Sequence, residues 1–376
     1  MSRLTSPYLL ALCGCTLAGV FGPACAQNVQ VTEPPTAEEI QAAESAPLFA
    51  SQDLLELTLE ADFHTIRRED RSDEDSEERP ATMRWTNDDG STETQEIQIQ
   101  TRGNFRLSRR NCDFPPLRLN VKKEPTEGTL FEGQDKLKLV VTCKLGQDYW
   151  EDYVLAEYLV YRMYGLFTPL SFRVRLAKVT YIDNSGEDEA FSRFAFLVED
   201  NDVMAIRNGG RKVDWQPDAV LHPARVEKRL AILVDVFQYM IGNTDWSGAQ
   251  MHNMELFLRP PSTYVTIPYD FDMSGIIDTR YSRPDGSLPI RSVRDRIFRG
   301  FCPQEVGRDP ADYEQVFEEF RQKKDELYAL WTNQEGMSED RVKDTLEYLD
   351  EFFEILNDPR KVQVEMLNHC RPLQRL

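Results

Sequence analysis

The chain has 376 residues, of which 41% are hydrophobic and 10% aromatic, and its formal net charge is −20. This apolar content is enough for a sizeable core, so we predict a folded chain and not a disordered one. A surface this acidic repels phosphate backbones and anionic lipids, which excludes a general nucleic-acid or membrane-surface binder. At about 150 residues per domain, the length indicates two folded units or one large unit with two parts.

The first 26 residues have the features of a secretory signal peptide. Arg3 is their only charged residue, an apolar stretch covers residues 8–21, and small residues stand at Ala24 and Ala26, where signal peptidase needs them. The apolar stretch is short for a membrane span. We therefore expect cleavage after Ala26, no membrane span in the mature chain, and export to the periplasm or the cell exterior. An uncleaved anchor is one alternative. A lipoprotein is another, because Cys13, Cys15 and Cys25 lie in this segment, although the residues before each cysteine fit a lipidation motif poorly.

The N-terminal half of the mature chain is predicted to be rich in strands. Residues 27–51 are rich in Pro, Glu and Ala, and we expect this segment to be mobile. Apolar and polar residues then alternate, which is typical of half-buried strands. The alternating segments are 55–63, 83–85, 97–101, 117–122 and 136–141. We therefore predict an antiparallel sheet over residues 53–143.

Helical periodicity dominates the rest of the chain. Apolar residues at helical spacing predict a helix over 149–166, a buried helix over 227–241 that ends at Gly242, and helices over 313–331 and 339–356. Strands are predicted at 172–182, 191–199, 254–258 and 264–267. This order divides the chain into a β-rich N-terminal lobe, residues 52–200, and a helical C-terminal lobe, residues 201–376.

Four cysteines remain after the signal peptide: Cys112, Cys143, Cys302 and Cys370. An even number in an exported chain predicts two disulfides, and three pairings are possible. The first two cysteines share a strand-rich region and the last two a helical region, which favours pairing within each region. The histidines show no zinc-binding spacing, and we interpret them as ordinary surface or helix-end residues: His64, His222, His252 and His369.

Polar residues with a suggestive spacing follow the buried helix. Asp245 lies on the loop after this helix, Asn253 begins the next strand, and Asp270 and Asp272 follow the hairpin. In phosphoryl transfer one carboxylate orients the acceptor hydroxyl and takes its proton, while an amide and a second carboxylate hold magnesium on the nucleotide phosphates. Turn chemistry and a solvated loop would explain each group separately. Glycoside hydrolysis by Asp245 and Asp270 is another alternative.

These segments resemble a known family. The chain looks like a distant member of the spore-coat protein H family of secreted atypical protein kinases, over roughly residues 97–280. The motifs that carry the resemblance are Arg102-Gly103-Asn104, Gly133-Gln134-Asp135-Lys136-Leu137-Lys138-Leu139, Phe196-Leu197-Val198-Glu199-Asp200, Asn243-Thr244-Asp245 and Ile267-Pro268-Tyr269-Asp270-Phe271-Asp272. The resemblance implies an α+β, two-lobed, protein-kinase-like fold with ATP between the lobes.

The resemblance also implies roles for residues of the helical part. Asp245 would be the catalytic base. Asn253 and Asp270 would bind magnesium, with Asp272 as a second candidate.

In the β-rich part, a lysine would hold the ATP phosphates. Lys138 and Lys122 both qualify, and Lys138 lies in the better-matched strand. Glu157, on the helix that follows, would pair with this lysine, and an ordinary exposed charge is the alternative for it. In place of the family's glycine-rich loop, Arg102 with Arg106, Arg109 and Arg110 would form a basic loop near the phosphates, and a solvated hairpin tip is the alternative.

The chain also departs from the family pattern. Trp246-Ser247-Gly248 stands where the family often has Arg and His after the catalytic Asp. A glycine-rich phosphate loop of standard spacing is absent from the sequence. The main hypothesis is an exported kinase that transfers phosphate from Mg-ATP to a protein hydroxyl. The alternatives are a non-catalytic relative that serves as a cell-envelope binding or scaffold module, and an unrelated exported α+β protein. Convergence of Asp245, Asn253 and Asp270 would argue against the last of these.

Overall fold

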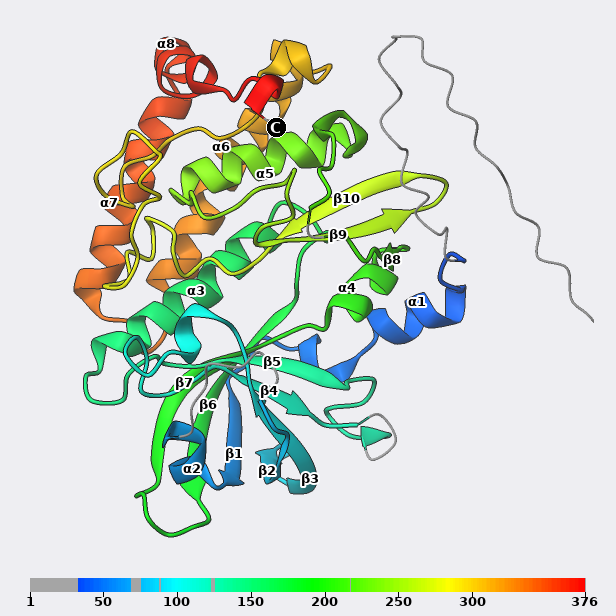
Figure 1. The fold of residues 1–376 in the computed structure, drawn as a ribbon, viewed down its shortest axis with the longest axis vertical. Helices are drawn as coiled ribbons and strands as arrows, with labels where there is room; N and C mark the ends of the chain where they lie inside the picture. The colour runs from blue at the N-terminus through cyan, green and yellow to red at the C-terminus, as the bar shows by residue number, and fades with distance from the viewer. Residues whose placement is uncertain (1–32, 69–75, 88, 123–125, 217, 376) are drawn as a thin grey trace, which may run out of the picture. The chain divides into compact units, whose positions relative to one another are not determined.

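The computed structural model describes residues 33–68, 76–87, 89–122, 126–216 and 218–375. The predicted signal peptide, residues 1–26, lies outside this part of the chain. Within it, a barrel of strands occupies one end and most helices gather at the other, with helix α3 (Tyr149–Gly165) running between them (Figure 1).

Among the described residues, seven strands close into a barrel in the order β1-β2-β3-β4-β5-β7-β6. The alternation seen in the sequence places one face of each strand inside: Leu57 and Leu59 of β1 and Leu137 and Leu139 of β5 are buried in the same cluster. The strands are β1 (Leu55–Ala61), β2 (Arg79–Thr86), β3 (Thr92–Thr101), β4 (Leu117–Asn120), β5 (Lys136–Val140), β6 (Val174–Asp183) and β7 (Phe191–Val198).

Parallel pairing of β1 with β6 closes the barrel. Seven residue pairs join the two strands, from Leu55 with Ala177 to Ala61 with Asp183. The antiparallel pairing predicted within residues 53–143 is confirmed for β1 to β5. The expected two-lobed, protein-kinase-like fold is wrong, because the strand-rich region is a closed barrel and not a sheet lobe. The parallel partner lies far away in the sequence, so local periodicity gave no sign of the closure.

A second sheet lies between the barrel and α5 in Figure 1, with the strand order β10-β9-β8. Its strands are β8 (Arg211–Lys212), β9 (Met254–Arg259) and β10 (Thr263–Pro268). The helices besides α3 are α1 (Ala37–Glu44), α2 (Phe63–Arg68), α4 (Asn201–Arg207), α5 (Lys228–Met240), α6 (Pro310–Thr332), α7 (Glu339–Leu356) and α8 (Pro359–Lys361).

Capping residues define both ends of the buried helix α5. The Glu227 carboxylate accepts from the first backbone N–H groups of the helix, at Arg229 and Leu230. Gly242, with φ of 65°, follows its C-terminus. A Cβ at this position would lie 2.1 Å from the Tyr348 hydroxyl oxygen, so the turn needs glycine for space as well as for its backbone angle.

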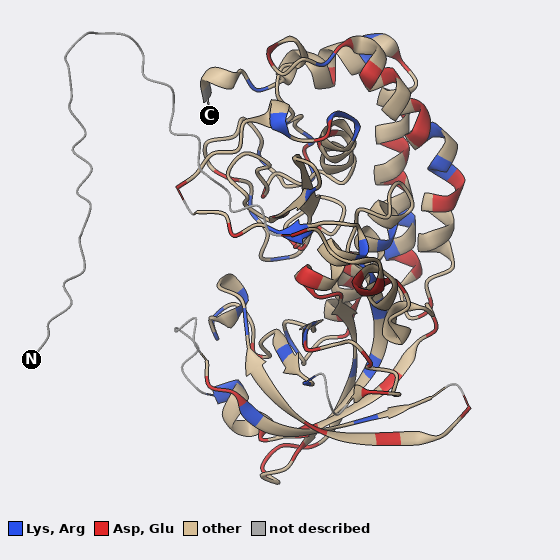
Figure 2. Ribbon diagram, turned by 90° about the vertical axis from the view of Figure 1, so that its right-hand side faces the viewer, with Lys and Arg blue, Asp and Glu red and all other residues tan. Residues whose placement is uncertain are grey.

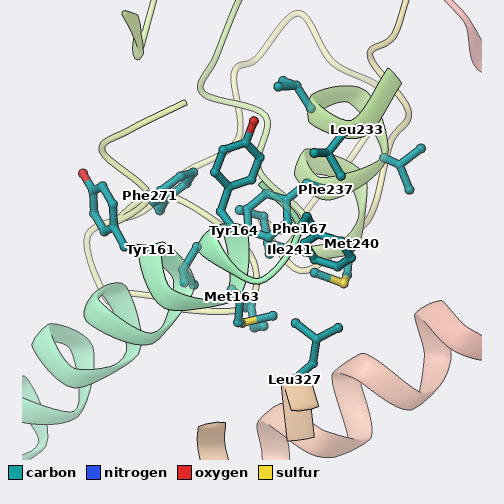
Figure 3. Close-up of a cluster of buried hydrophobic side chains, with 14 of the residues drawn as sticks. Tyr161, Met163, Tyr164, Phe167, Leu233, Phe237, Met240, Ile241, Phe271 and Leu327 are labelled. Carbon is teal, nitrogen blue, oxygen red and sulfur yellow. The ribbon is translucent and has the colours of Figure 1, made fainter. Parts of the chain in front are cut away.

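The largest core cluster joins α3, α5 and α6 (Figure 3). Tyr164 of α3 packs edge-on against Phe237 of α5, with ring centroids 5.0 Å apart. Tyr161 packs in the same way against Phe271, at 4.9 Å. Such aromatic pairs add to the free energy gained by burial alone. The cluster therefore fixes α3 relative to the segment that follows β10.

Part of the segment expected to be mobile is helical. Helix α1 begins with a capping box in which the Thr36 and Glu39 side chains accept from each other's backbone N–H groups. Glu39 also forms an ion pair with Arg211 at 2.6 Å, and Glu44 pairs with Arg173 at 2.6 Å. These contacts hold α1 against the folded chain.

The favoured disulfide pairing is confirmed. Cys112 bonds to Cys143, and Cys302 bonds to Cys370. Stable disulfides are typical of proteins that fold in oxidising compartments. None of the helices in the described residues combines the length and hydropathy needed to cross a membrane.

Replacing both cysteines of either bridge with serine should lower the free energy of unfolding by about 3–5 kcal/mol, because the unfolded chain gains conformational freedom. The loss should be slightly larger for Cys302 and Cys370, which are 68 positions apart, than for Cys112 and Cys143, which are 31 apart. Denaturant unfolding of the two double variants beside the oxidised chain measures this. A change below about 1 kcal/mol would contradict a stabilising role.

Candidate functional site

Seven of the eight site residues predicted from the sequence line one cavity of about 340 Å³ between the barrel and the helical part. The barrel side and α3 contribute three of them, and the loops around the β9–β10 hairpin contribute four. They are Arg102, Lys138, Glu157, Asp245, Asn253, Asp270 and Asp272. Lys122 does not line this cavity; it is exposed and follows β4.

The β9–β10 hairpin brings Asn253 and Asp270 together. Met254 at the start of β9 pairs with Pro268 at the end of β10, and the backbone N–H of Tyr269 donates to the Asn253 carbonyl at 3.1 Å. Asn253 and Asp270 both have left-handed backbone angles, with φ of 51° and 58°. Asn and Asp tolerate this conformation better than other side chains do. The hairpin therefore presents an amide and a carboxylate from neighbouring ends of two strands.

Asp245 is hydrogen-bonded to three side chains, those of Asn243, His252 and Asn253. Its backbone N–H donates to the Asn243 side chain at 2.9 Å, which fixes the turn after α5. Its two carboxylate oxygens contact His252 Nε2 at 2.8 Å and Asn253 Nδ2 at 3.0 Å. The hydrogen bond with Asp245 raises the pKa of His252 above its ordinary value. The carboxylate is thus oriented toward the cavity, and lone pairs on its oxygens can accept a further proton donor.

Three cations on the barrel side of the cavity, Arg102, Arg106 and Lys138, have no carboxylate ion-pair partner among the described residues. Arg106 donates to the backbone carbonyl of Val141, and Lys138 Nζ donates to Asn201 Oδ1 at 2.9 Å. Burial lowers the pKa of Arg102. Burial and the neighbouring Arg102 charge lower the pKa of Lys138 to about 8. Cations that are only partly neutralised attract an anion.

Lys138 is aimed at the cavity by the pleat of β5. Leu137 and Leu139 point into the barrel, so Lys138 points outward on the opposite face. Its amine lies 5.1 Å from the ring centroid of Tyr269, within cation–π distance. Of the two lysines that the sequence left open, the structure places Lys138 on the cavity.

Two carboxyl groups in the cavity are buried. Glu157 on α3 is 3% exposed and Asp272 is 8% exposed. Burial and the charges of Asp272 and Asp270 raise the pKa of Glu157 well above its usual range. Burial and the charge of Asp270 raise the pKa of Asp272 to about 7, although Tyr281 donates to it at 2.8 Å. A cation bound between these groups would relieve their mutual repulsion.

The expected pairing of Lys138 with Glu157 is not formed in this structure. Both side chains line the cavity, but the Lys138 amine is hydrogen-bonded to Asn201, which in turn donates to Glu255 at 2.6 Å. Lys212 also contacts Glu255, at 3.5 Å. Lys138 is therefore held toward α4 and β9, and Glu157 remains among the other carboxyl groups.

Within the described residues, no three or more His, Cys, Asp or Glu side chains are placed to hold a metal ion by themselves. Magnesium on a nucleotide needs fewer protein ligands, since one or two carboxylates are supplemented by phosphate oxygens and water. Asn253 and Asp270 have the hard oxygen donors that this ion prefers, and Asp272 is close by in the same cavity. The donor set therefore fits magnesium bound together with a polyphosphate.

The charged residues of the cavity differ from those of much of the surface in how they are paired. On the long helices α6 and α7, acidic and basic residues are interspersed (Figure 2), and several form ion pairs, such as Arg321 with Glu314 at 2.7 Å. Exposed pairs of this kind contribute little to stability. Against this background, the cations without carboxylate partners in the cavity stand out as a binding feature.

Several site residues were not found from the sequence. His252 was interpreted as an ordinary surface residue, yet it contacts Asp245. Its position beside Asn253 was the available signal. Tyr161 accepts a hydrogen bond from the Asp270 backbone N–H at 2.9 Å, but as one aromatic residue of an apolar helix it gave no signal. Of the four arginines of the predicted basic loop, only Arg102 and Arg106 reach the cavity.

Lys138→Met should stabilise the protein at neutral pH. The pKa of Lys138 is about 8 in the folded protein and 10.5 ordinarily. Below pH 8 Lys138 is protonated in both the folded and the unfolded chain, so the folded wild type bears the full cost of the buried charge. Between pH 8 and 10.5 the lysine is protonated only in the unfolded chain. The stability of the wild type therefore increases as the pH rises through this range. The expected gain at pH 7 is about 1 kcal/mol, because solvent reaches part of the side chain.

Denaturant unfolding at several pH values tests this, with Lys122→Met as the matched control. The gain should be present at pH 7 and should disappear toward pH 10.5. A Lys138→Met variant that is less stable than the wild type at pH 7, or a pH-independent difference, would contradict the proposed burial of this charge.

Comparison with known proteins gives no match: neither a family model nor a curated protein matches the chain. The resemblance drawn from the sequence motifs therefore stays a prediction, and the function has to be argued from the cavity and its residues.

Proposed function

We propose that the chain is a magnesium-dependent phosphotransferase that moves the terminal phosphate of ATP to a hydroxyl group of a protein. The observation that carries this proposal is the convergence on one cavity of three cations without a carboxylate ion-pair partner among the described residues and an oriented Asp245 carboxylate. Phosphoryl transfer depends almost entirely on positioning and charge stabilisation, so these groups are the ones it requires.

The cations of the barrel side support nucleotide binding. Lys138 of β5 and Arg102 would hold the phosphate oxygens. Arg106, on the same loop as Arg102, would add positive charge. The carboxyl groups that line the same cavity would repel bare ATP, so its binding should depend on a divalent cation. Asp270 and Asn253 would hold magnesium, with Asp272 as the second carboxyl, and the ion would supply positive charge that offsets the charge of the phosphates.

Asp245 would act on the acceptor. Its carboxylate accepts a hydrogen bond from the acceptor hydroxyl and takes the proton as the hydroxyl oxygen bonds to the terminal phosphorus of ATP. The bond from that phosphorus to the bridging oxygen breaks at the same time, and ADP leaves. His252 keeps the carboxylate oriented and, when protonated, adds positive charge. It would partly replace the basic residues that the sequence lacks directly after Asp245.

The proposal places this reaction outside the cytoplasm. The two disulfides and the features of residues 1–26 support export to the periplasm or the cell exterior. The acceptor would then be another exported or cell-envelope protein.

A binding module without catalysis is the second candidate. It is favoured by the Lys138 amine, which is hydrogen-bonded to Asn201 and forms no ion pair with Glu157. Such a module would bind a nucleotide or another polyanion in the same cavity and transfer no phosphate.

Asp245→Asn should lower phosphate transfer by about 10²–10⁴-fold, because the base is lost, and should leave the Kd for Mg-ATP nearly unchanged. Transfer from labelled ATP to protein acceptors and calorimetric binding give the two quantities. Asp325→Asn, an exposed residue of α6, is the matched control and should retain full transfer. Equal transfer by the wild type and Asp245→Asn would refute the role of Asp245. ATP binding by the wild type without any transfer would favour the binding module.

A further inference from the structure

A second cavity of about 260 Å³ adjoins the first. Asp245, His252 and Met273 line both cavities. In the proposed reaction the nucleotide occupies the first cavity and Asp245 takes a proton from the acceptor. The second cavity is therefore on the side from which an acceptor hydroxyl can reach the Asp245 carboxylate.

Two arginines, Arg299 and Arg283, line this second cavity. Arg299 Nη1 donates to the backbone carbonyl of Thr244 at 2.9 Å, which anchors the guanidinium beside the Asp245 loop. Its Nε is buried and has no hydrogen-bond partner. Arg283 Nη1 donates to the carbonyls of Arg280 and Ser282, at 3.1 and 2.6 Å. A guanidinium has five N–H donors, so these contacts leave donors of both arginines for a ligand.

The arginines of this cavity are not in direct contact with its carboxylates. Among the described residues neither arginine forms an ion pair, although Asp245 and Asp285 line the same cavity. Asp285 Oδ1 accepts from the backbone N–H of Ser287 at 2.8 Å, and the Asp245 carboxylate is hydrogen-bonded to His252 and Asn253 and not to either arginine. Two anchored arginines beside a reacting group are typical of recognition of a carboxylate or phosphate.

We propose that the second cavity binds an acidic acceptor segment, in which a carboxylate side chain lies within one or two residues of the acceptor hydroxyl. This inference rests on the proposed phosphate transfer and names its substrate class. The Arg299 guanidinium donates hydrogen bonds to this carboxylate inside the cavity. Arg283 adds a second positive charge at the exposed edge of the cavity. The proposed preference for an acidic segment is the opposite of what the net charge of −20 would produce, because that charge attracts basic proteins. The specificity therefore comes from the local arginines.

The test compares two short peptides that differ only in charge: one with a serine followed by Asp and Glu, the other with Asn and Gln at those positions. Calorimetry with the full chain, both disulfides formed and a non-hydrolysable ATP analogue present, measures peptide binding without any turnover. The acidic peptide should bind at least about tenfold more tightly, and Arg299→Gln should remove most of this difference. Arg291→Gln, an exposed arginine outside both cavities, is the matched control and should retain it.

The Kd of the ATP analogue and the transfer of phosphate are measured on the same variants. Equal binding of the two peptides by the wild type overturns the inference. It is also overturned if Arg299→Gln weakens binding of the ATP analogue as much as binding of the acidic peptide, because Arg299 would then belong to the nucleotide site. Selective binding of the acidic peptide that is lost in Arg299→Gln supports the inference. If that binding occurs without any transfer of phosphate, the proposed function fails and the acidic-segment site remains.

Discussion

The hydrogen bond from the Asp270 backbone N–H to the Tyr161 hydroxyl ties the segment after β10, which we propose to bind metal, to helix α3. The Tyr161 ring also packs against Phe271, and against Phe196 of barrel strand β7 at 5.6 Å. One side chain therefore contacts the barrel and the loop after β10 at once. Glu157 lies one turn earlier on the same face of α3. Any shift of α3 would move the barrel cations and the hairpin carboxylates relative to each other.

The cavity contains charge that the fold does not neutralise. Lys138 and Arg102 have lowered pKa values, and Glu157 and Asp272 have raised ones, because burial disfavours the charged form of each group. Groups of this kind reduce stability and are found where a ligand or a reaction needs them. A polyphosphate would satisfy the cations, and magnesium would satisfy the carboxyl groups. The cations and the carboxyl groups of the cavity would thus each be matched by one part of the Mg-ATP that we propose as its ligand.

The disulfide between Cys112 and Cys143 stabilises the position of the cavity's cations. The backbone N–H groups of Asp113 and Phe114 donate to the Cys143 carbonyl, at 3.0 and 3.2 Å. Arg106, on the loop that precedes Cys112, donates to the carbonyl of Val141 at the end of β5. The bridge therefore restrains the arginine loop against the strand that carries Lys138.

Local sequence patterns were sufficient for most elements of the fold. Alternation located β1 to β5, and apolar periodicity located α3 and α5, because both signals depend only on neighbouring residues. The closure of the barrel was not predictable in this way, since Leu55 pairs with Ala177 across more than a hundred residues. For the same reason the choice between Lys138 and Lys122 needed the structure. The role of His252 was missed because it depends on a turn that brings the side chain into contact with Asp245.

Magnesium-dependent binding of ATP is the measurement that tests the central claim most directly. Calorimetry would compare the full chain, with its disulfides formed, with Asp270→Ala, in the presence and absence of magnesium. The account predicts binding by the wild type that requires magnesium and is lost in Asp270→Ala. No binding at millimolar ATP by a folded sample, or binding that is indifferent to both magnesium and Asp270, would contradict it.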